Sequence, residues 1–441
     1  MPKALVGLYE AVVAVVICAG LLYFLATTIS GLRHERRMRR RGPVPLELTG
    51  RGGVRQIYFL VPCLDEQEVI ARTVTQLCAA DPRAHVVLID DGCADATVPR
   101  ARGACPEGRL TVITRTAPEA RQGKGAALNA GLRHVVADIA LRGLPPHDVV
   151  IGVMDADGRL SVRAVDQVLE LFDDPRVGGA QLPVRIVNRH RLITRVQDME
   201  FWGLAAVSQF GRIATSTVSL GGNGQFTRLS ALLTVSDHPW SSALTEDLDL
   251  TVSLVTRGWK LTSTPHAWVE QQGLESWRRL ARQRTRWMQG HMTAVTRLPE
   301  LWASLRVGHL ALLEVTMYLL VPWVLVLGWS VLFHLTLAVT VFHLSHGQLW
   351  GQGLSTVPAA LLWYVVSFFP NLIAACLYRR RAGDCSLLRS LLLGHVLLPA
   401  NYVAYAAVWR GLLRMLRRRH GWDKTRRVLD TAPAPAGALP K

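Results

Sequence analysis

The chain has 441 residues, half of them hydrophobic, and its 50 Lys and Arg residues outnumber 33 Asp and Glu residues, giving a net charge of +17. A basic balance with this apolar content indicates an integral membrane protein whose cytoplasmic flanks carry the cations, since anionic lipid and the positive-inside bias favour Lys and Arg there. It argues against a nucleic-acid-binding protein, because the arginine runs lie beside apolar spans rather than between aromatic residues.

An apolar stretch from Ala4 to Leu32, interrupted only by Glu10, opens the chain. It exceeds the roughly 20 residues that a helix needs to cross a bilayer, so residues 1–32 are predicted to form a transmembrane helix. A cleaved signal peptide would have a shorter apolar region and a small-residue cleavage site, whereas this stretch leads directly into the cations of Arg33–Arg41. The basic linker, residues 33–55, is therefore expected to place the next domain on the cytoplasmic side of the plasma membrane.

Residues 56–270 are predicted to form one soluble α/β domain. Helical-looking segments, among them Glu66–Ala80 and Ala126–Ala137, alternate there with β-rich runs. The predicted strands are Ile57–Val61, Val86–Ile89, Leu110–Ile113 and Val149–Met154. Nearly continuous apolar strands between helices indicate a largely parallel, Rossmann-like sheet that is covered on both faces.

The cysteines of this domain are expected to be free. Cys63, Cys78, Cys93 and Cys105 are scattered singly, with no C-x-x-C spacing. This pattern predicts a reducing compartment, with neither a disulfide framework nor a zinc site.

Residues 271–306 contain an amphipathic segment, Ser276–Leu298, in which apolar residues recur at helical spacing with arginines between them. Such a helix can lie in the headgroup layer of a membrane. Residues 307–411 are predicted to hold about three to four transmembrane helices. Their apolar regions are His309–Leu344, Val357–Tyr378 and Leu387–Val408.

Two membrane arrangements remain open. The first apolar region is longer than one span needs, and a tight hairpin around Gly328 would give four passes after the domain. Four passes return the basic tail, residues 412–441, to the cytoplasm but leave Arg379–Arg381 outside, whereas three passes do the reverse. We favour four passes, with a disordered end to the tail over Thr431–Lys441.

Acidic residues follow two of the predicted strands. Asp90-Asp91-Gly92 comes after the second strand and Asp155-Ala156-Asp157 after the fourth. Ligands of open α/β sheets bind at the carboxyl ends of the strands, so these residues are expected to meet in one crevice. Asp155 and Asp157 are suited to a divalent cation that holds a diphosphate, although a solvated turn would also explain them.

A glycine-rich segment, Gly123-Lys124-Gly125, precedes a predicted helix. Glycines before a helix N-terminus let backbone N–H groups and the lysine approach phosphate oxygens. The spacing is not that of a Walker A loop, and a plain glycine-rich helix start is equally compatible with the pattern.

Two later motifs carry further candidates. Asp247, in Thr245-Glu246-Asp247, is a candidate base for an acceptor hydroxyl, and the alternative is an acidic first helical turn with Thr245 as N-cap. Gln283, Arg286 and Trp287 fall at i, i+3 and i+4 and so share one helix face. An indole suits a sugar ring, whereas a tryptophan at the membrane interface beside arginine is the plainer interpretation.

In their order and spacing, these motifs resemble those of the membrane-embedded family 2 glycosyltransferases, which include cellulose, chitin, hyaluronan and poly-N-acetylglucosamine synthases. The resemblance covers roughly residues 57–290 and begins with Val61-Pro62-Cys63-Leu64-Asp65-Glu66. It implies a GT-A fold with α-helical transmembrane segments, a UDP-sugar donor, Mg²⁺ or Mn²⁺, and inversion to a β-linkage. Asp65 departs from the pattern, because Asn is usual there.

The resemblance also implies roles for individual residues. Donor binding falls to Glu66, Asp90, Asp91, Lys124 and Asp155, and metal binding to Asp155 and Asp157. Catalysis falls to Asp247, flanked by Glu246 and Thr245. The acceptor and the tunnel entrance would be lined by Gln283, Arg286, Trp287, Gly222 and Asn223.

Three functions follow from this resemblance. The first is a processive synthase that elongates a β-linked polysaccharide through its own membrane helices, with export partners unknown. The second is a transferase that adds one or a few sugars to a membrane lipid, because ceramide glucosyltransferases carry a related Gln-x-x-Arg-Trp motif. The third, a non-enzymatic export scaffold, is disfavoured because every expected carboxylate is present.

Overall fold

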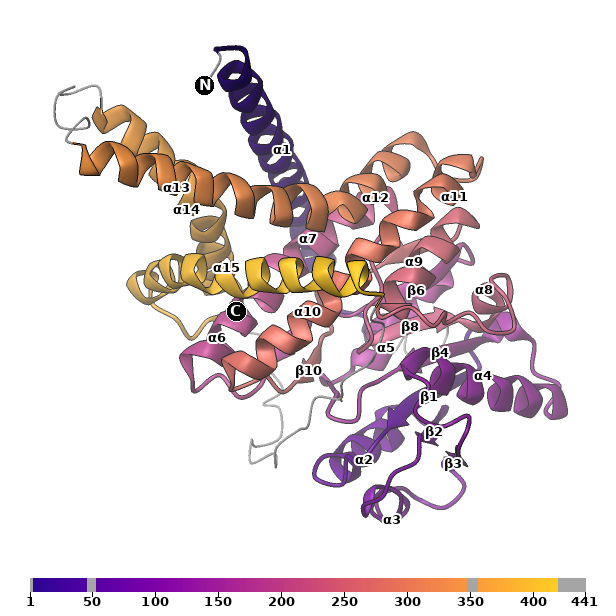
Figure 1. Ribbon diagram of the computed structural model, residues 1–441. Helices are drawn as coiled ribbons and strands as arrows, with labels where there is room; N and C mark the ends of the chain where they lie inside the picture. Colours follow the sequence, from indigo (N-terminus) through magenta and orange to yellow (C-terminus); the bar gives the residue numbers. More distant parts are fainter. Residues whose placement is uncertain (1–2, 46–52, 347–355, 419–441) are drawn as a thin grey trace.

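The computed structural model describes residues 3–45, 53–346 and 356–418, which form an α/β domain with long helices beside it (Figure 1). The basic linker is described only in part. The tail beyond residue 418, with its expected disorder, lies outside the described residues.

A seven-stranded sheet forms the centre of the α/β domain, in the order β3-β2-β1-β4-β8-β6-β9. Its strands are β1 Gln56–Cys63, β2 Ala84–Asp90, β3 Leu110–Thr114, β4 Val149–Val153, β6 Val177–Gln181, β8 Gln225–Arg228 and β9 Lys260–Thr262. All neighbours are parallel except β8, which is antiparallel to both β4 and β6. The largely parallel Rossmann-like sheet predicted from the sequence is confirmed. A small second sheet has the order β5-β10-β7, formed by Arg159–Leu160, Val269–Gln271 and Val184–Ile186.

Helices cover both faces of the large sheet, as alternation along β1 requires. Ile57 and Phe59 belong to a core that includes α2 and α5, whereas Tyr58 and Leu60 belong to a second core with α4 and α9. The helices of the domain are α2 Ile70–Ala80, α3 Thr97–Gly103, α4 Lys124–Leu141, α5 Ala164–Leu169, α8 Leu229–Leu233 and α9 Glu246–Thr256. Helix α2 begins four residues later than predicted, because a turn precedes it in which the N–H groups of Val69 and Ile70 both donate to the carbonyl oxygen of Glu66.

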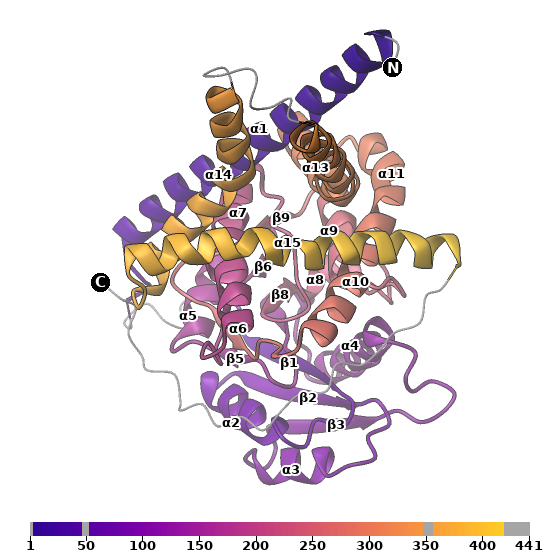
Figure 2. The same cartoon turned by 60° about the vertical axis from the view of Figure 1, so that its left-hand side comes forward.

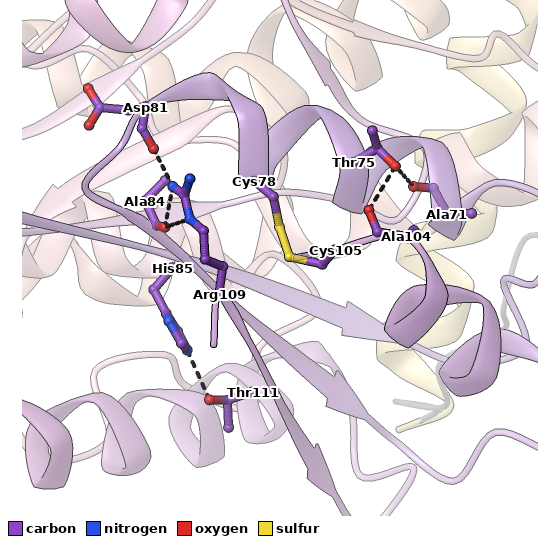
Figure 3. The surroundings of a disulfide bond; sticks show 10 residues. All are labelled: Ala71, Thr75, Cys78, Asp81, Ala84, His85, Ala104, Cys105, Arg109 and Thr111. Atoms are coloured by element: carbon purple, nitrogen blue, oxygen red, sulfur yellow. Dashed lines mark hydrogen bonds between the residues drawn. A yellow bond between two sulfur atoms is a disulfide. The ribbon is translucent and has the colours of Figure 1, made fainter. Parts of the chain in front are cut away.

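The expectation that all cysteines are free is wrong. Cys78, on α2, forms a disulfide with Cys105, which follows α3 (Figure 3). Helices α2 and α3 pack side by side, and this brings the two Cα atoms to 6.2 Å although 27 residues separate them in sequence. Sequence spacing alone could not show this approach, and the cysteines therefore give no support for a reducing compartment.

Helix α1, Lys3–Arg41, continues through the basic segment instead of ending at residue 32. It crosses α7, Ala206–Gly211, at direct backbone contact. A Cβ atom on Gly31 would lie 2.0 Å from the carbonyl oxygen of Val207, and one on Gly211 would lie 2.2 Å from that of Thr27. Only glycine permits this approach, which fixes the end of α1 on the α/β domain.

The predicted hairpin around Gly328 is wrong. Helix α12, His309–Val321, passes through a π-helical segment, Pro322–Gly328, into α13, Trp329–Ser345. Pro322 lacks the N–H that a helix interior uses for a backbone hydrogen bond, but the backbone stays helical through and beyond Gly328. The first apolar region is therefore one bent helix, which projects away from the α/β domain (Figure 1).

Helix α14, Thr356–Ala382, leads back to the α/β domain. Near its end, Arg381 is buried and forms an ion pair with Glu35 of α1, with 2.5 Å between Nη1 and Oε1. Its guanidinium also lies 4.3 Å from the ring centroid of Trp202. The end of α14 that carries Arg379–Arg381 therefore lies against the end of α1 that contacts the α/β domain.

Helix α15, Leu387–Leu416, runs across the molecule rather than projecting from it (Figure 2). Just before it, Asp384 forms an ion pair with Arg189. Near its end, the Nε of Arg414 donates to Oε1 of Gln289 at 2.8 Å. Val403, at its middle, packs on Ile193 and its neighbours. Both ends and the middle of α15 thus contact the domain or α10, Trp277–Thr293, the amphipathic helix predicted at Ser276–Leu298.

By length and composition alone, two of the described helical segments, His309–Leu335 and Leu387–Leu416, are long and apolar enough to cross a membrane. This is weak evidence for a membrane protein. The remaining helices are α6 Leu192–Asp198, which continues through a π-helical segment into α7, and α11 Leu298–Ala303.

Candidate active site

A cavity of about 500 Å³ lies at the carboxyl ends of the central strands, between the α/β domain and α10. Its wall contains every sequence-predicted site residue except one. These are Glu66, Asp91, Lys124, Asp155, Asp157, Gly222, Asn223, Thr245, Glu246, Asp247, Gln283, Arg286 and Trp287. The crevice expected at the strand ends is therefore present.

Asp90 is the residue that does not line the cavity. Its Oδ1 accepts hydrogen bonds from the N–H groups of Gly92 and Cys93, so the carboxylate closes the turn after β2. Asp91 lines the cavity and pairs with Arg115, with 2.5 Å between Oδ1 and Nη1. The two neighbouring carboxylates, for which the sequence predicted the same role, thus have different positions: only that of Asp91 lines the cavity.

Lys124 stands at the centre of the acidic part of the cavity, at the start of α4. Its Nζ donates to Oδ1 of Asp155 and to the carbonyl oxygen of Gly222, each at 2.5 Å. Burial alone would lower the pKa of Lys124, but the carboxylates of Asp155 and Glu246 outweigh it and raise that pKa. Gly123, with φ +109°, permits the backbone turn that starts the helix.

Asp155 and Asp157 offer carboxylate oxygens to the same cavity and fit a divalent cation by their chemistry. The backbone of Asp155 is held by Asn223, because the N–H of Asp155 donates to the side-chain oxygen of Asn223 at 3.2 Å. Oδ2 of Asp157 accepts from the N–H of Gln272 at 3.2 Å. The backbone of Asp155 and the carboxylate of Asp157 are therefore held in place, and the site residues present suit Mg²⁺ or Mn²⁺.

Glu246, which is buried, and Asp247, which is half-buried, open α9 and form an acidic pair beside Lys124. Burial raises the pKa of both carboxyl groups, and the Asp247 carboxylate adds to the effect on Glu246, whereas Lys124 opposes it on both. Oδ1 of Asp247 accepts from the N–H of Leu248 at 2.7 Å. Thr245 occupies the N-cap position, but its hydroxyl makes no capping hydrogen bond. The capping interpretation therefore does not account for this threonine.

The predicted shared face of α10 is confirmed, because Gln283, Arg286 and Trp287 all line the cavity. The positive charge of Arg286 opposes the rise in the pKa of Glu246, so this arginine acts on the acidic pair. The Trp287 ring meets Phe201 edge to face, with 6.1 Å between centroids, and the guanidinium of Arg284 lies 4.5 Å from its centroid. These two contacts position the indole at the edge of the cavity.

His291 and Tyr318 also line the cavity and were missed by the sequence motifs. The His291 ring lies 4.8 Å from that of Tyr318, and its Nε2 lies 2.9 Å from the Tyr318 carbonyl oxygen. That oxygen only accepts, so Nε2 carries the proton and Nδ1 is the acceptor. Burial lowers the pKa of His291 to about 4, which keeps the ring neutral. Continuing the face of α10 by one turn beyond Trp287 would have found this residue.

Gly290 lets α10 approach the acidic pair. A Cβ atom there would lie 2.6 Å from Cγ2 and 2.7 Å from Oγ1 of Thr245, so Gly290→Ala must push α10 and α9 apart. We expect the turnover rate to fall about 100-fold, because small misplacements of reacting groups have effects of this order. Gly328→Ala is the matched control, since its Cβ would meet nothing closer than 3.6 Å. Equal turnover of the two variants would show that this contact does not position the site.

Comparison with known proteins identifies relatives of the chain. The chain is 33% identical over 244 residues to beta-monoglucosyldiacylglycerol synthase from Synechocystis sp., covering 53% of this chain and 47% of that protein. It is 26% identical over 240 residues to poly-beta-1,6-N-acetyl-D-glucosamine synthase from Staphylococcus aureus, covering 53% and 54%. The chain thus spans about half the length of the curated relatives it matches.

Among solved structures, the mannosyltransferase PcManGT from Pyrobaculum calidifontis, in complex with GDP-Man and Mn²⁺, gives a TM-score of 0.49 at 16% identity. The match covers 92% of this chain and 99% of that one. Residues 55–290, more than half of the chain, match the family described as "Glycosyltransferase like family 2". These residues contain the α/β sheet and the whole acidic part of the cavity. The chain therefore belongs to glycosyltransferase family 2 and has its GT-A fold.

Proposed function

We propose that the chain is an inverting hexosyltransferase that moves a sugar from a UDP-sugar to a membrane lipid, adding one or a few sugars. The observation that carries this proposal is the composition of the cavity wall. Of the helices that follow α10, only α12 contributes to it, through Tyr318, and none of the described residues of α13, α14 or α15 lines it. A polymer channel would need lining residues from several of these helices.

The packing of α15 against α10 supports the same choice. The backbone of Gln289 on α10 lies within 3.3 Å of the position where a Cβ would stand on Gly411. Together with the Arg414 hydrogen bond to Gln289, this contact closes the side of α10 that faces away from the cavity. The lipid-glucosylating relative with 33% identity is consistent with a lipid acceptor.

The chemistry follows from the placement of the acidic pair. Asp247 takes the proton of the acceptor hydroxyl, whose oxygen bonds to the anomeric carbon as the bond from that carbon to the diphosphate oxygen breaks. Attack from the face opposite the leaving UDP inverts the configuration. Lys124 and Arg286 offset the negative charge of the diphosphate, and Asn223 holds Asp155 in place. A divalent cation held by Asp155 and Asp157 would supply Lewis-acid stabilisation of the leaving diphosphate.

We infer a membrane arrangement that differs from both sequence-based alternatives. Helix α1 crosses the membrane to the side that holds the domain. Helices α12 and α13 cross away from that side and α14 crosses back to it, so Arg379–Arg381 lie on the same side as the domain. Helix α15 lies in the plane of the membrane surface because both of its ends contact the domain or α10. Every described basic cluster is then on one side, the cytoplasmic one by the positive-inside bias.

His291 is expected to bind the acceptor, because Nδ1 of its neutral ring can accept a hydrogen bond from an acceptor hydroxyl. His291→Phe keeps a flat ring without this acceptor atom and should raise the KM for the lipid about tenfold while leaving the KM for the UDP-sugar unchanged. His291→Asn, whose side-chain oxygen can replace Nδ1, should recover much of the loss. A change in both KM values would indicate a structural role instead.

The function is tested with purified protein, Mn²⁺ and a panel of radiolabelled UDP-sugars, with diacylglycerol or total lipid as acceptor. We expect one donor to give a discrete glycolipid in the organic phase. The second candidate, processive polysaccharide synthesis, is favoured by the Staphylococcus aureus relative. It predicts a high-mass, aqueous product that is sensitive to a β-glycosidase.

A further inference from the structure

A second cavity, of about 510 Å³, lies along one face of α1, away from the candidate active site. It is formed between α1 and Ala214, which follows α7. The α1 residues that line it fall on successive turns: Ala26, Ile29, Ser30, Arg33, His34 and Arg37. We call this feature the α1 groove.

The α1 groove is apolar at one end and cationic at the other. Ile29 is 46% exposed, and Leu22, two turns earlier on the same face, is 68% exposed. Arg33 and Arg37 are also exposed. From Ala26 to Arg37 the helix rises about 16 Å, which is comparable to a lipid headgroup with the first part of its acyl chains.

The arginines of the α1 groove make no ion pair within the described part of the chain. The acidic residue of this segment, Glu35, is buried, and it pairs with Arg39 and Arg381 on the opposite side of α1. Ser30 is fixed through its hydroxyl, which donates to the carbonyl oxygen of Gly211 at 3.0 Å. The close contact of Gly31 with Val207 keeps this face of α1 turned outward. Two arginines without an ion pair among the described residues thus lie on a face of α1 whose orientation is fixed.

We propose that the α1 groove binds an anionic phospholipid. The phosphate lies between Arg33 and Arg37, and the acyl chains follow Ile29 and Leu22 toward the membrane. Charge complementarity favours an anionic headgroup over a zwitterionic one, because no described carboxylate in the α1 groove offsets the two guanidinium groups. The proposal rests on the membrane placement given under the proposed function, but not on the acceptor or the sugar.

The test uses the full chain in mixed micelles of phosphatidylglycerol and phosphatidylcholine, with bound lipid counted by native mass spectrometry. The double variant Arg33→Gln/Arg37→Gln should weaken phosphatidylglycerol retention by more than about tenfold, at about fivefold for each arginine. The matched control is Arg36→Gln/Arg40→Gln. It removes the same charge from exposed positions of α1 that do not line the α1 groove, and it should retain lipid like the wild type.

Three results would overturn the proposal. Equal loss in the two double variants would mean diffuse attraction by the basic segment, and no loss in either would mean that the α1 groove binds nothing. Displacement of the lipid by glycerol phosphate at equal concentration would mean a site for a free phosphate. The assay contains no sugar donor or acceptor, so it does not depend on transfer. A wild-type chain that remains soluble without detergent would instead contradict the membrane placement itself.

Discussion

Asp247→Asn should lower the turnover rate roughly 10²–10⁴-fold, the range that a positioned general base contributes. The amide cannot take the acceptor proton, but its oxygen can still accept from the N–H of Leu248, so the start of α9 should keep its structure. Binding of UDP, measured by calorimetry, should stay near the wild-type value because the residues proposed to contact the donor are others of the cavity wall.

Asp249→Asn provides the matched control two residues further along α9. The Asp249 carboxylate pairs with Arg297 and does not line the cavity, so this variant should turn over at close to the wild-type rate. An Asp247→Asn enzyme that works as fast as the wild type would remove Asp247 from the role of base. An equal loss in both variants would point to a general disturbance of α9.

Asp155→Asn should be nearly as damaging. The change would remove a proposed charged ligand of Mg²⁺ or Mn²⁺, and it also replaces the carboxylate that accepts from Lys124. We expect a loss of at least 100-fold in turnover, together with weaker Mn²⁺ binding measured by paramagnetic relaxation of water protons. Chelation with EDTA should silence the wild-type enzyme, and either cation should restore it.

Asp65→Asn controls for a different acidic group. Asp65, Cys93 and Asp95 are the one set of three ligand-type residues brought within 4.8 Å in the described part of the chain, and Asp65 itself is exposed. Asparagine keeps the oxygen that accepts from the N–H of Ala94. Unchanged Mn²⁺ binding in Asp65→Asn, with a loss in Asp155→Asn, would locate the cation. The reverse pattern would exclude Asp155 as its ligand.

The sequence predicted what local patterns determine. The four apolar runs became β1 to β4, because nearly continuous apolar strands between helices have few alternative arrangements. Motif residues that follow strand ends meet in one cavity for the same topological reason. Asp90 is the instructive exception. It is next to Asp91 in sequence, but the turn after β2 directs its carboxylate to backbone N–H groups.

What the sequence missed depends on contacts between distant segments. The Cys78–Cys105 disulfide follows from the packing of α2 on α3, and the roles of His291 and Tyr318 follow from the packing of α10 on α12. Hydropathy marked Leu387–Val408 as a membrane span, yet it could not show that α15 lies against α10. Charge counting alone left open whether Arg379–Arg381 lie on the side of the domain or on the opposite side. The ion pair between Glu35 and Arg381, 346 residues apart in sequence, places them beside α1 and the domain.

The most direct test of a single transfer to lipid is the number of UDP molecules released per acceptor molecule when the lipid is limiting and the UDP-sugar is in excess. The proposed function predicts that release stops after one or a few equivalents, with all acceptor converted to glycolipid. Release that continues long after the acceptor is consumed, with the label in a product of growing mass, would contradict it and establish a polymer synthase.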